Sequence, residues 1–208
     1  MSKETKPLAK RLPLTDEQIR THTIGALKPL SSRILIVDYD PQWPELFGRE
    51  AVRIRAALGH RALRIEHTGS TAVPDLVAKP IIDMLLVVID SADEDAYARD
   101  LEAAGYVLRI RETNWFEHRM FNGPDTEINL HVFSSGCPEI DRVLMFRDWL
   151  RNNATDRALY ASNKLALARQ KWNYVQNYAD AKTVVIEEII ARAGASIGKN
   201  ETSALTPE

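Results

Sequence analysis

The stretch EHTGSTAVPDLVAKPIIDMLLVV, residues 66–88, combines a turn of small residues with an apolar run that contains one carboxylate. The turn is Gly-Ser-Thr at residues 69–71, and a proline-bounded loop leads from it to Lys79. Residues 80–89 are almost continuously Ile, Leu and Val, which is typical of a strand buried on both faces. Asp83 lies inside this run. The stretch therefore predicts a short strand, a tight turn and a central strand with an isolated acidic side chain.

The sequence around this stretch predicts an alternation of strands and helices. Short runs rich in β-branched and aromatic residues are bounded by Gly, Pro and Asn, which favours strands separated by turns. Apolar residues spaced three and four apart between Trp43 and Leu58 favour a helix, and Gly59 ends it. We expect strands at residues 33–39, 62–67, 80–89, 106–111, 117–121 and 127–133, and helices near 15–21, 43–58 and 91–104.

Beyond Pro138 the apolar period changes from two to about 3.6, which indicates three helices, within residues 140–150, 160–167 and 184–193. Strands followed by helices are typical of the α+β class, here a mixed sheet with a helical C-terminal subdomain. We predict four parts: an N-terminal arm (1–32), a core (33–135), a helical subdomain (138–193) and a flexible tail (194–208).

The composition excludes several classes of protein. With 27 Lys and Arg against 29 Asp and Glu, the net charge is −2, so we expect no duplex nucleic acid as partner. A single cysteine excludes an internal disulfide and a cysteine-based zinc site. No apolar run approaches the roughly 20 residues that span a bilayer, and the first residues do not form a secretion signal. We expect a cytoplasmic protein without a membrane partner.

The Gly-Ser turn and Asp83 suggest phosphate chemistry. A Gly-Ser pair that leaves a strand exposes backbone N–H groups and a hydroxyl toward an anion, and a carboxylate on the next strand then holds Mg²⁺ against the phosphates. This arrangement resembles that of nucleotidyltransferases, so Ser70 and Asp83 are our candidate catalytic residues. The second carboxylate of that pattern is absent, because its position is Leu85. The alternative is a structural turn beside a hydrogen-bonded aspartate.

Two histidines extend this hypothesis. His67 precedes the turn, and His131 lies in an apolar strand, where it shares a face with Asn129 because strand side chains alternate. If the strands are neighbours, His67, Asp83 and His131 form a two-histidine, one-carboxylate metal site. Such a set suits a borderline divalent metal such as Mn²⁺, Fe²⁺ or Zn²⁺. The cofactor we expect is Mg²⁺ or Mn²⁺, with another transition metal as the alternative. The alternative is that each histidine is a hydrogen-bonded residue of the inner face.

Several polar residues further along are candidates for phosphate binding. Lys79 enters the central strand, and either His118 or the pair Glu117 and Arg119 faces the site. A Tyr-x-x-x-Lys spacing occurs twice on predicted helices, where residues four apart share a face; a solvated face is the alternative. The predicted phosphate-binding set is Gly69, Ser70, Thr71, Lys79, Arg119, Arg147, Tyr160, Lys164 and Lys182, with Tyr178 paired to Lys182.

These blocks together resemble the GrpB family. The matching segments run in order from about residue 37 to about residue 193, and a similar region is appended to some bacterial dephospho-CoA kinases. The kinase itself is not represented, because no G-x-x-x-x-G-K-[ST] loop occurs. The resemblance rests on HTGSTAVP (67–74), AKPIID (78–83), NLHVF (129–133), FRDWLR (146–151) and the Tyr160–Lys164 pair.

The resemblance implies a nucleotidyltransferase-like fold in which Ser70 and Asp83 carry the active-site comparison. This chain has Asp75 after Pro74, where the family generally has glycine. Glycine at that position permits a positive φ in a turn, and aspartate tolerates it less well. His131 stands about where a nucleotidyltransferase has its third carboxylate.

We therefore expect a protein that uses a nucleoside triphosphate and a divalent metal to transfer a nucleoside monophosphate to a small-molecule or protein acceptor. The site is expected in the cleft between the core and the helical subdomain. Two alternatives remain open at this stage: a catalytically degenerate module that binds a nucleotide or CoA, and a histidine-based metal-binding protein.

Overall fold

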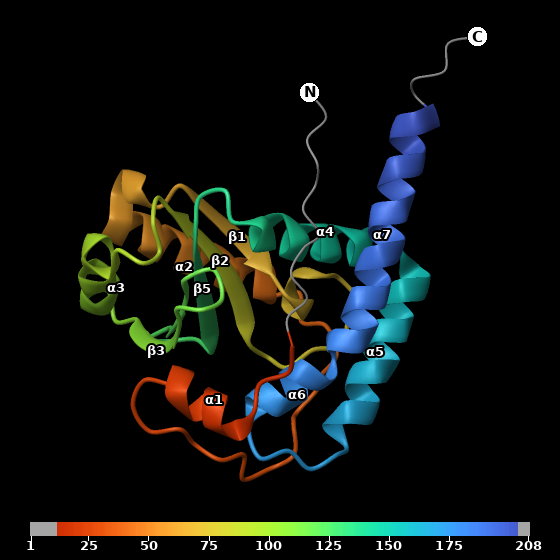
Figure 1. Ribbon diagram of the computed structural model, residues 1–208, viewed down its shortest axis with the longest axis horizontal. Helices are drawn as coiled ribbons and strands as arrows, with labels where there is room; N and C mark the ends of the chain where they lie inside the picture. The colour runs from red at the N-terminus through yellow and green to blue at the C-terminus, as the bar shows by residue number, and fades with distance from the viewer. Residues whose placement is uncertain (1–11, 204–208) are drawn as a thin grey trace.

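The structure, a computed structural model, describes the backbone of residues 12–203 and the side chains of residues 12–196. Its centre is a five-stranded sheet in the order β1-β2-β5-β4-β3, with β2 and β5 parallel and the other neighbours antiparallel (Figure 1). The strands are β1 (Arg64–Thr68), β2 (Ile82–Val88), β3 (Val107–Glu112), β4 (His118–Asn122) and β5 (Ile128–Ser134).

One face of the sheet is covered by α2 (Trp43–Leu58) and α3 (Ala98–Ala103). The even-numbered residues of β2 and β5 point to this face, because successive strand side chains alternate. Met84, Leu86 and Leu130 are fully buried there against Ile54 of α2. Burial of this apolar surface is the main contribution to the stability of the core.

The opposite face meets the helical C-terminal part. The helix α4 (Pro138–Asn152) packs over Leu85 and Phe133, whereas α5 (Ala154–Ala168) and α7 (Thr183–Ser203) pack on Val73 and Leu76 in the loop after β1. The short helix α6 (Val175–Ala181) lies between α5 and α7. In Figure 1 these helices stand beside the sheet, so the loop between β1 and β2 is enclosed between the two halves.

The helix α1 (Asp16–His22) lies beside α6 (Figure 1), to which its segment is joined by hydrogen bonds. The backbone N–H of Leu14 donates to Asp180, and Arg20 donates to the hydroxyl of Tyr174. The backbone N–H of Ile24 then donates to Arg109 on the outer edge of the sheet. The described part of the predicted N-terminal arm, from residue 12 onward, therefore packs on the rest of the protein. Residues 1–11 lie outside the described residues.

The predicted α+β class, with a mixed sheet and a helical C-terminal part, is confirmed. The strand predicted at residues 33–39 is wrong: within the described residues this segment makes a single β-bridge, between Val37 and Ala78. Its apolar residues Ile34 and Ile36 pack against Tyr178 near α6 instead of joining the sheet. An apolar β-branched run can bury its side chains in either setting, so the sequence pattern alone did not distinguish them.

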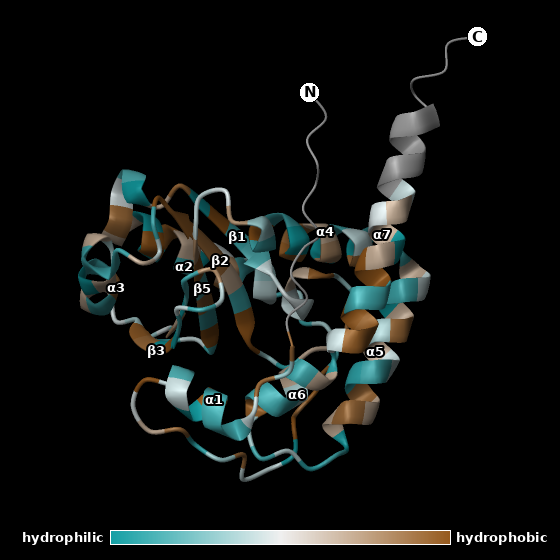
Figure 2. Cartoon of the chain, in the orientation of Figure 1, coloured by the Kyte–Doolittle hydropathy of each residue, from teal (hydrophilic) through white to brown (hydrophobic). Residues whose placement is uncertain are grey.

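Three helical predictions also need correction. Residues 91–104 form a 3₁₀ turn at Glu94–Ala96 followed by the short α3, because the chain bends at Tyr97. The helix α6 was not predicted as a separate element. The helix α7 continues to Ser203, past the predicted start of a flexible tail at residue 194; residues 204–208 lie outside the described residues. Hydropathy along the chain (Figure 2) marks no helix of the described part as long and apolar enough to cross a membrane.

Candidate functional site

A cavity of about 100 Å³ lies where the turn after β1, the start of β2 and the helices α5 and α6 meet. We call it the lysine pocket. The turn contributes residues 69–71, and the start of β2 with the loop before it contributes Lys79 and Asp83. The helical part contributes Tyr160, Lys164, Tyr178 and Lys182. The structure thus brings together both predicted catalytic residues and most of the predicted phosphate-binding set, from segments more than 100 positions apart.

Gly69 brings the turn close to Asp83. Its backbone has a φ of 65° and a ψ of −167°, a region that is essentially restricted to glycine. A Cβ atom at this position would overlap the carboxylate of Asp83 and lie 2.9 Å from its Cβ atom. Ser70 then begins a short 3₁₀ turn (Ser70–Ala72). Only glycine fits here, because both the backbone conformation and the close approach exclude a side chain.

The three lysines of the pocket have few partners. Lys164 is 2% exposed and donates to the carbonyl of Val77, and its ammonium lies 4.8 Å from the ring centroid of Tyr160. The Lys182 ammonium lies 3.9 Å from the ring centroid of Tyr178, and that of Lys79 lies 5.9 Å from it. Among the described residues, none of the three forms an ion pair within 4 Å. Of the described residues that line the pocket, Asp83 is the one with a carboxylate.

Burial and mutual repulsion destabilise the charged form of these lysines. Burial, together with repulsion from Lys182, lowers the pKa of Lys164 from 10.5 to about 7, against the opposing attraction of Asp83. Burial and the charge of Lys79 lower the pKa of Lys182 to about 7 as well. The pKa of Lys79 is also lowered by burial. A bound anion would restore the positive charge of all three, because an opposite charge favours the protonated form.

Tyr178 provides an unused hydrogen-bonding group. Its side chain is 1% exposed, and its hydroxyl has no hydrogen-bond partner in the described part of the chain. Burial raises the pKa of this hydroxyl to about 12, so it remains protonated at neutral pH. A buried hydroxyl without a partner costs free energy, on the order of 1–3 kcal/mol. Tyr178 also lines the lysine pocket, and Lys79 and Lys182 lie over its ring.

Asp83 lies next to Asn129 and His131, as the sequence predicted for neighbouring strands. Asn129 donates to Asp83 Oδ1 at 3.0 Å, and His131 Nε2 lies 3.9 Å from the same oxygen. Burial would raise the pKa of Asp83, but the hydrogen bonds and charges of His131, Asn129 and Lys79 outweigh it and lower that pKa. Asp83 is therefore ionised at neutral pH and available to a cation.

His67 does not belong to this group, contrary to the predicted metal site. The register of β1 and β2 pairs Thr68 with Asp83, so His67 faces the opposite side of the sheet with Met84. There its ring stacks on Phe47 at 4.9 Å. Burial lowers the pKa of His67 to about 4, so it is neutral at pH 7. Within the described residues no group of three or more His, Cys, Asp or Glu side chains is placed to hold a metal ion.

Arg119 and Arg147 also lie outside the lysine pocket. Arg119 pairs with Val132 in the sheet, on the face covered by α2 and α3, and its guanidinium binds Glu94 and Glu117. Because side chains alternate along β4, His118, the residue before Arg119, points to the opposite face of the sheet, the face that carries Asp83. Arg147 of α4 donates to Glu66, to the backbone carbonyl of His67 and to Asp148. Both guanidinium groups are therefore held by ion pairs within the protein and do not line the lysine pocket.

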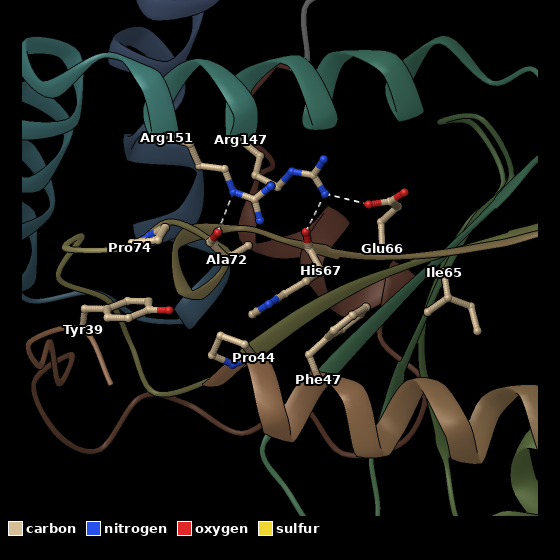
Figure 3. A pocket seen from close by; sticks show the side chains of 10 residues that line it. All are labelled: Tyr39, Pro44, Phe47, Ile65, Glu66, His67, Ala72, Pro74, Arg147 and Arg151. Atoms are coloured by element: carbon tan, nitrogen blue, oxygen red, sulfur yellow. Dashed lines mark hydrogen bonds and ion pairs between the residues drawn. The ribbon is translucent and has the colours of Figure 1, made fainter. Parts of the chain in front are cut away.

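A second cavity, of about 490 Å³, lies on the other side of the turn (Figure 3). We call it the arginine cavity. Figure 3 shows Arg147 and Arg151 reaching down from α4 to the backbone carbonyls of His67 and Ala72, while Phe47 and Tyr39 form the opposite wall. The two arginines thus bind the backbone on either side of the Gly69–Thr71 turn. The same turn lines the lysine pocket.

Three residues near the site were not in the predicted set. Tyr178 was visible in the sequence as the partner of Lys182 at helical spacing. His118, offered as one of two possibilities, contacts His131, with 3.0 Å between His118 Nε2 and His131 Nδ1. Glu112, which contacts His118, gave no signal in the sequence. Its placement depends on the register of the hairpin β3–β4, which includes an irregularity between Leu108 and Ile110.

Comparisons with known proteins agree on one family. A sequence model described as "GrpB protein" matches residues 33–192. A UPF0157 protein from Halalkalibacterium halodurans is 60% identical over 184 residues, which cover 88% of this chain and 94% of that protein. A dephospho-CoA kinase from Mycobacterium tuberculosis is 33% identical over 175 residues, which cover 71% of this chain but only 42% of the kinase.

Solved structures give the same result. The crystal structure of the conserved protein GrpB from Enterococcus faecalis superimposes with a TM-score of 0.68 and 31% identity, over 76% of this chain and 96% of that one. The Cid1 poly(U) polymerase superimposes with a TM-score of 0.42 and 9% identity, over 62% of this chain and 45% of that one. The TM-score and the sequence identity of the polymerase are both too low to indicate a shared function with this chain.

Proposed function

The chain belongs to the GrpB family, and from the lysine pocket at its centre we propose that it binds the phosphate chain of a nucleoside triphosphate. We further propose that it transfers the nucleoside monophosphate to a small-molecule or protein acceptor and releases pyrophosphate. The observation that carries the proposal is the group of three lysines beside the Gly69–Ser70 turn and Asp83: Lys164 is buried, Lys79 and Lys182 are half-buried, and none of them forms an ion pair within the described part of the chain. Unpaired buried cations are costly, and phosphate oxygens would compensate them.

Each side of the pocket has a role in this proposal. The backbone N–H groups and the hydroxyl of Ser70 bind phosphate oxygens. Lys79, Lys164 and Lys182 neutralise the charge that develops during transfer. The volume of about 100 Å³ is well below the roughly 300 Å³ of the smallest drug-sized pockets. The pocket therefore holds phosphate groups, and the nucleoside lies at its mouth.

The divalent metal of the proposal enters with the nucleotide. Asp83 provides one carboxylate, and His131 is the imidazole nearest to it, which is too few ligands to hold a resident ion. Mg²⁺ is commonly bound through one or two carboxylates together with substrate phosphates. Asp83 fits that role for Mg²⁺ or Mn²⁺, and the ion would neutralise negative charge on the phosphates when bound. The lysines supply the remaining positive charge, in place of a second metal.

A second candidate function is binding without transfer. The position of the second carboxylate is Leu85, which is 1% exposed and packs under α4. With a single carboxylate, the pocket would bind the phosphates of a nucleotide or of CoA, and the protein would act as a sensor or an accessory module.

Calorimetric titration distinguishes these candidates. ATP, CTP, GTP, UTP and CoA are titrated into the wild type, Asp83→Ala and Lys164→Met, with and without Mg²⁺ or Mn²⁺. Lys171→Met, which removes an exposed lysine outside the pocket, serves as the control. We expect Lys164→Met to weaken nucleotide binding about tenfold, the loss of one charge-assisted hydrogen bond, and the control to leave it unchanged.

The role of Asp83 separates the enzyme from the sensor. Metal-dependent binding that Asp83→Ala abolishes, followed by pyrophosphate release with a suitable acceptor, supports transfer. Binding that is indifferent to metal and to Asp83→Ala supports the sensor. No binding of any of the five compounds would rule out both proposals.

A further inference from the structure

The arginine cavity, which the proposed function leaves unused, has the size of a site for a small organic molecule. Its volume of about 490 Å³ lies within the range of roughly 300–1,000 Å³ that is typical of ligand sites. One wall consists of flat side chains, those of Tyr39, Pro44 and Phe47. Figure 3 shows this wall opposite Arg147 and Arg151, so that a ligand in the cavity would lie between rings and guanidinium groups.

The aromatic wall is already ordered by contacts within the protein. The ring of Phe47 stacks on that of His67, with 4.9 Å between the centroids and 8° between the planes. The ring of Tyr39 packs edge-on against the buried Trp43, with 5.3 Å between the centroids. Both wall residues are half-buried, so part of each side chain stays accessible. An ordered aromatic surface binds a flat ring at a low cost in side-chain entropy.

The charge of the opposite wall is compensated. Arg147 forms ion pairs with Glu66 and with Asp148, each at 2.8 Å. Arg151 forms one with Asp148 at 3.1 Å. Two guanidinium groups thus share two carboxylates, and an anionic ligand would have to displace one of them. A neutral ring leaves these ion pairs in place, and the flat guanidinium group stacks well on aromatic rings.

Two hydrogen-bond donors of the cavity are unused. Within the described residues the hydroxyl of Tyr39 has no hydrogen-bond partner, and Figure 3 shows it pointing into the cavity. Arg151 donates from Nε to the carbonyl of Ala72 and from Nη1 to Asp148, which leaves its Nη2 without a partner in the described part of the chain. A ring with nitrogen or carbonyl acceptors at its edge offers partners to both donors.

We propose that the arginine cavity binds a neutral nitrogen heterocycle. The ring lies against Tyr39 and Phe47, and its acceptor atoms face the Tyr39 hydroxyl and Nη2 of Arg151. Nucleobases and pyridine carboxamides both have this chemistry. The inference goes beyond the proposed function and does not rest on it, because the cavity lies on the other side of the Gly69–Thr71 turn from the lysine pocket.

Calorimetric titration of phosphate-free compounds tests the site. Adenosine, uridine and nicotinamide are the heterocycles, ribose represents the sugar alone, and benzene represents a ring without acceptors. We expect at least one heterocycle to bind at millimolar concentrations or below, and the tightest of the three identifies its source. Benzene should bind at least about fivefold more weakly, because it lacks the hydrogen bonds. If none of the three heterocycles binds, or if ribose binds as well as adenosine, the proposal is overturned.

Two variants of Tyr39 place the heterocycle in the cavity. Tyr39→Phe removes the hydroxyl and keeps the ring, so binding should weaken about fivefold, the equivalent of one neutral hydrogen bond. Tyr39→Leu also removes the ring, and binding should weaken about fivefold further. The control is Tyr174→Phe, which removes a hydroxyl that accepts from Arg20 outside both cavities, and it should bind as the wild type does. Wild-type binding in both Tyr39 variants would refute the site, since the heterocycle would then lie elsewhere.

The result is separable from that of the nucleotide proposal by a titration with inorganic pyrophosphate, which has no ring. If a heterocycle binds in a Tyr39-dependent way but pyrophosphate and the nucleotides do not bind, the cavity site stands and the nucleotide proposal fails. If pyrophosphate binds and no heterocycle does, the cavity site fails and the nucleotide proposal stands.

Discussion

The lysine pocket and the arginine cavity lie on opposite sides of one turn, yet their cations have different surroundings. Arg147 has three partners of its own: two carboxylates and a backbone carbonyl. Arg151 likewise donates to the carbonyl of Ala72 and to Asp148. In the lysine pocket, Lys164 and Lys182 donate to backbone carbonyls and lie over the rings of Tyr160 and Tyr178, and neither forms an ion pair with a carboxylate of the described residues.

This difference separates structural charges from functional ones. A guanidinium that is saturated by protein acceptors stabilises the fold and has little capacity left for a ligand. A buried ammonium without a carboxylate partner costs stability, and a ligand that removes this cost binds more tightly. Both cavities contain cations, but in the described part of the lysine pocket three ammonium groups share a single carboxylate, that of Asp83. The predictions below test this distinction.

The largest effect is expected at Gly69, in the wall between the two cavities. Gly69→Ala places a Cβ atom against Asp83 in a backbone region that only glycine occupies, so we expect a loss of about 4 kcal/mol. Urea unfolding measures it. Gly136→Ala is the matched control: its φ is 79° but nothing lies within 4 Å of the added atom, so the loss should be about 1 kcal/mol. Equal losses in both variants would show that contact with Asp83 is unimportant.

On the arginine side, Arg147→Ala should destabilise the protein by about 3 kcal/mol. It removes a donor from the carbonyl of His67 and leaves Glu66 with Arg64 as its remaining ion-pair partner among the described residues. The comparison is Lys164→Met, which removes a buried ammonium whose pKa is lowered by burial; it should leave the free energy of unfolding at pH 7 unchanged or raise it, despite the lost bond to Val77. A loss in Lys164→Met as large as in Arg147→Ala would contradict the distinction between the two sides.

The two sides should also respond to pH in different ranges. Lys164 and Lys182 bind fewer protons in the folded than in the unfolded state between pH 7 and 10.5, so their contribution to stability rises with pH there. His67 also binds fewer protons in the folded than in the unfolded state, between pH 4 and pH 6.5. Its contribution to stability is therefore lost as the pH falls from 6.5 toward about 4.

Urea unfolding between pH 4 and 10 measures these contributions. His67→Gln should remove the acid dependence only, and the double variant Lys164→Met/Lys182→Met the alkaline dependence only. Anion binding in the lysine pocket should weaken as the pH rises through 7, by at most about tenfold per pH unit for each lysine. Binding that is constant from pH 6 to 9 would mean that these lysines keep their charge throughout.

The smallest effect is expected at Asp75. Its φ is 63°, so the positive φ suggested by the family's glycine is present in this chain with aspartate. Asp75→Gly relieves backbone strain but increases the entropy of the unfolded chain by a similar amount, so stability should change by less than about 0.5 kcal/mol. Phosphate binding should be unchanged, because Asp75 is exposed and does not line the lysine pocket. A tenfold change in binding would show that the conformation of this loop controls the pocket.

Much of the fold could be predicted from the sequence, because hydrophobic period, turn residues and caps act locally. The strands around residues 64–68, 82–88 and 128–134 and the helix from Trp43 to Leu58 follow these rules. The segment 33–39 was predicted wrongly, because its apolar residues can be buried either in a sheet or against α6, where they pack in the structure. For the site, the Gly-Ser turn, the carboxylate in the apolar strand and the repeated Tyr-x-x-x-Lys spacing identified Ser70, Asp83, Lys164 and Lys182, all of which line the lysine pocket.

The sequence by itself determined which residue types are available: a glycine turn, one carboxylate in an apolar strand and lysines at helical spacing. The tertiary structure decided which of them meet. Because side chains alternate along a strand, a shift of one position moves a residue to the other face. This placed His67 and Arg119 away from Asp83 and His118 toward it. Whether a cation is paired also depends on the packing of distant helices, so only the fold separated Arg147 from Lys164.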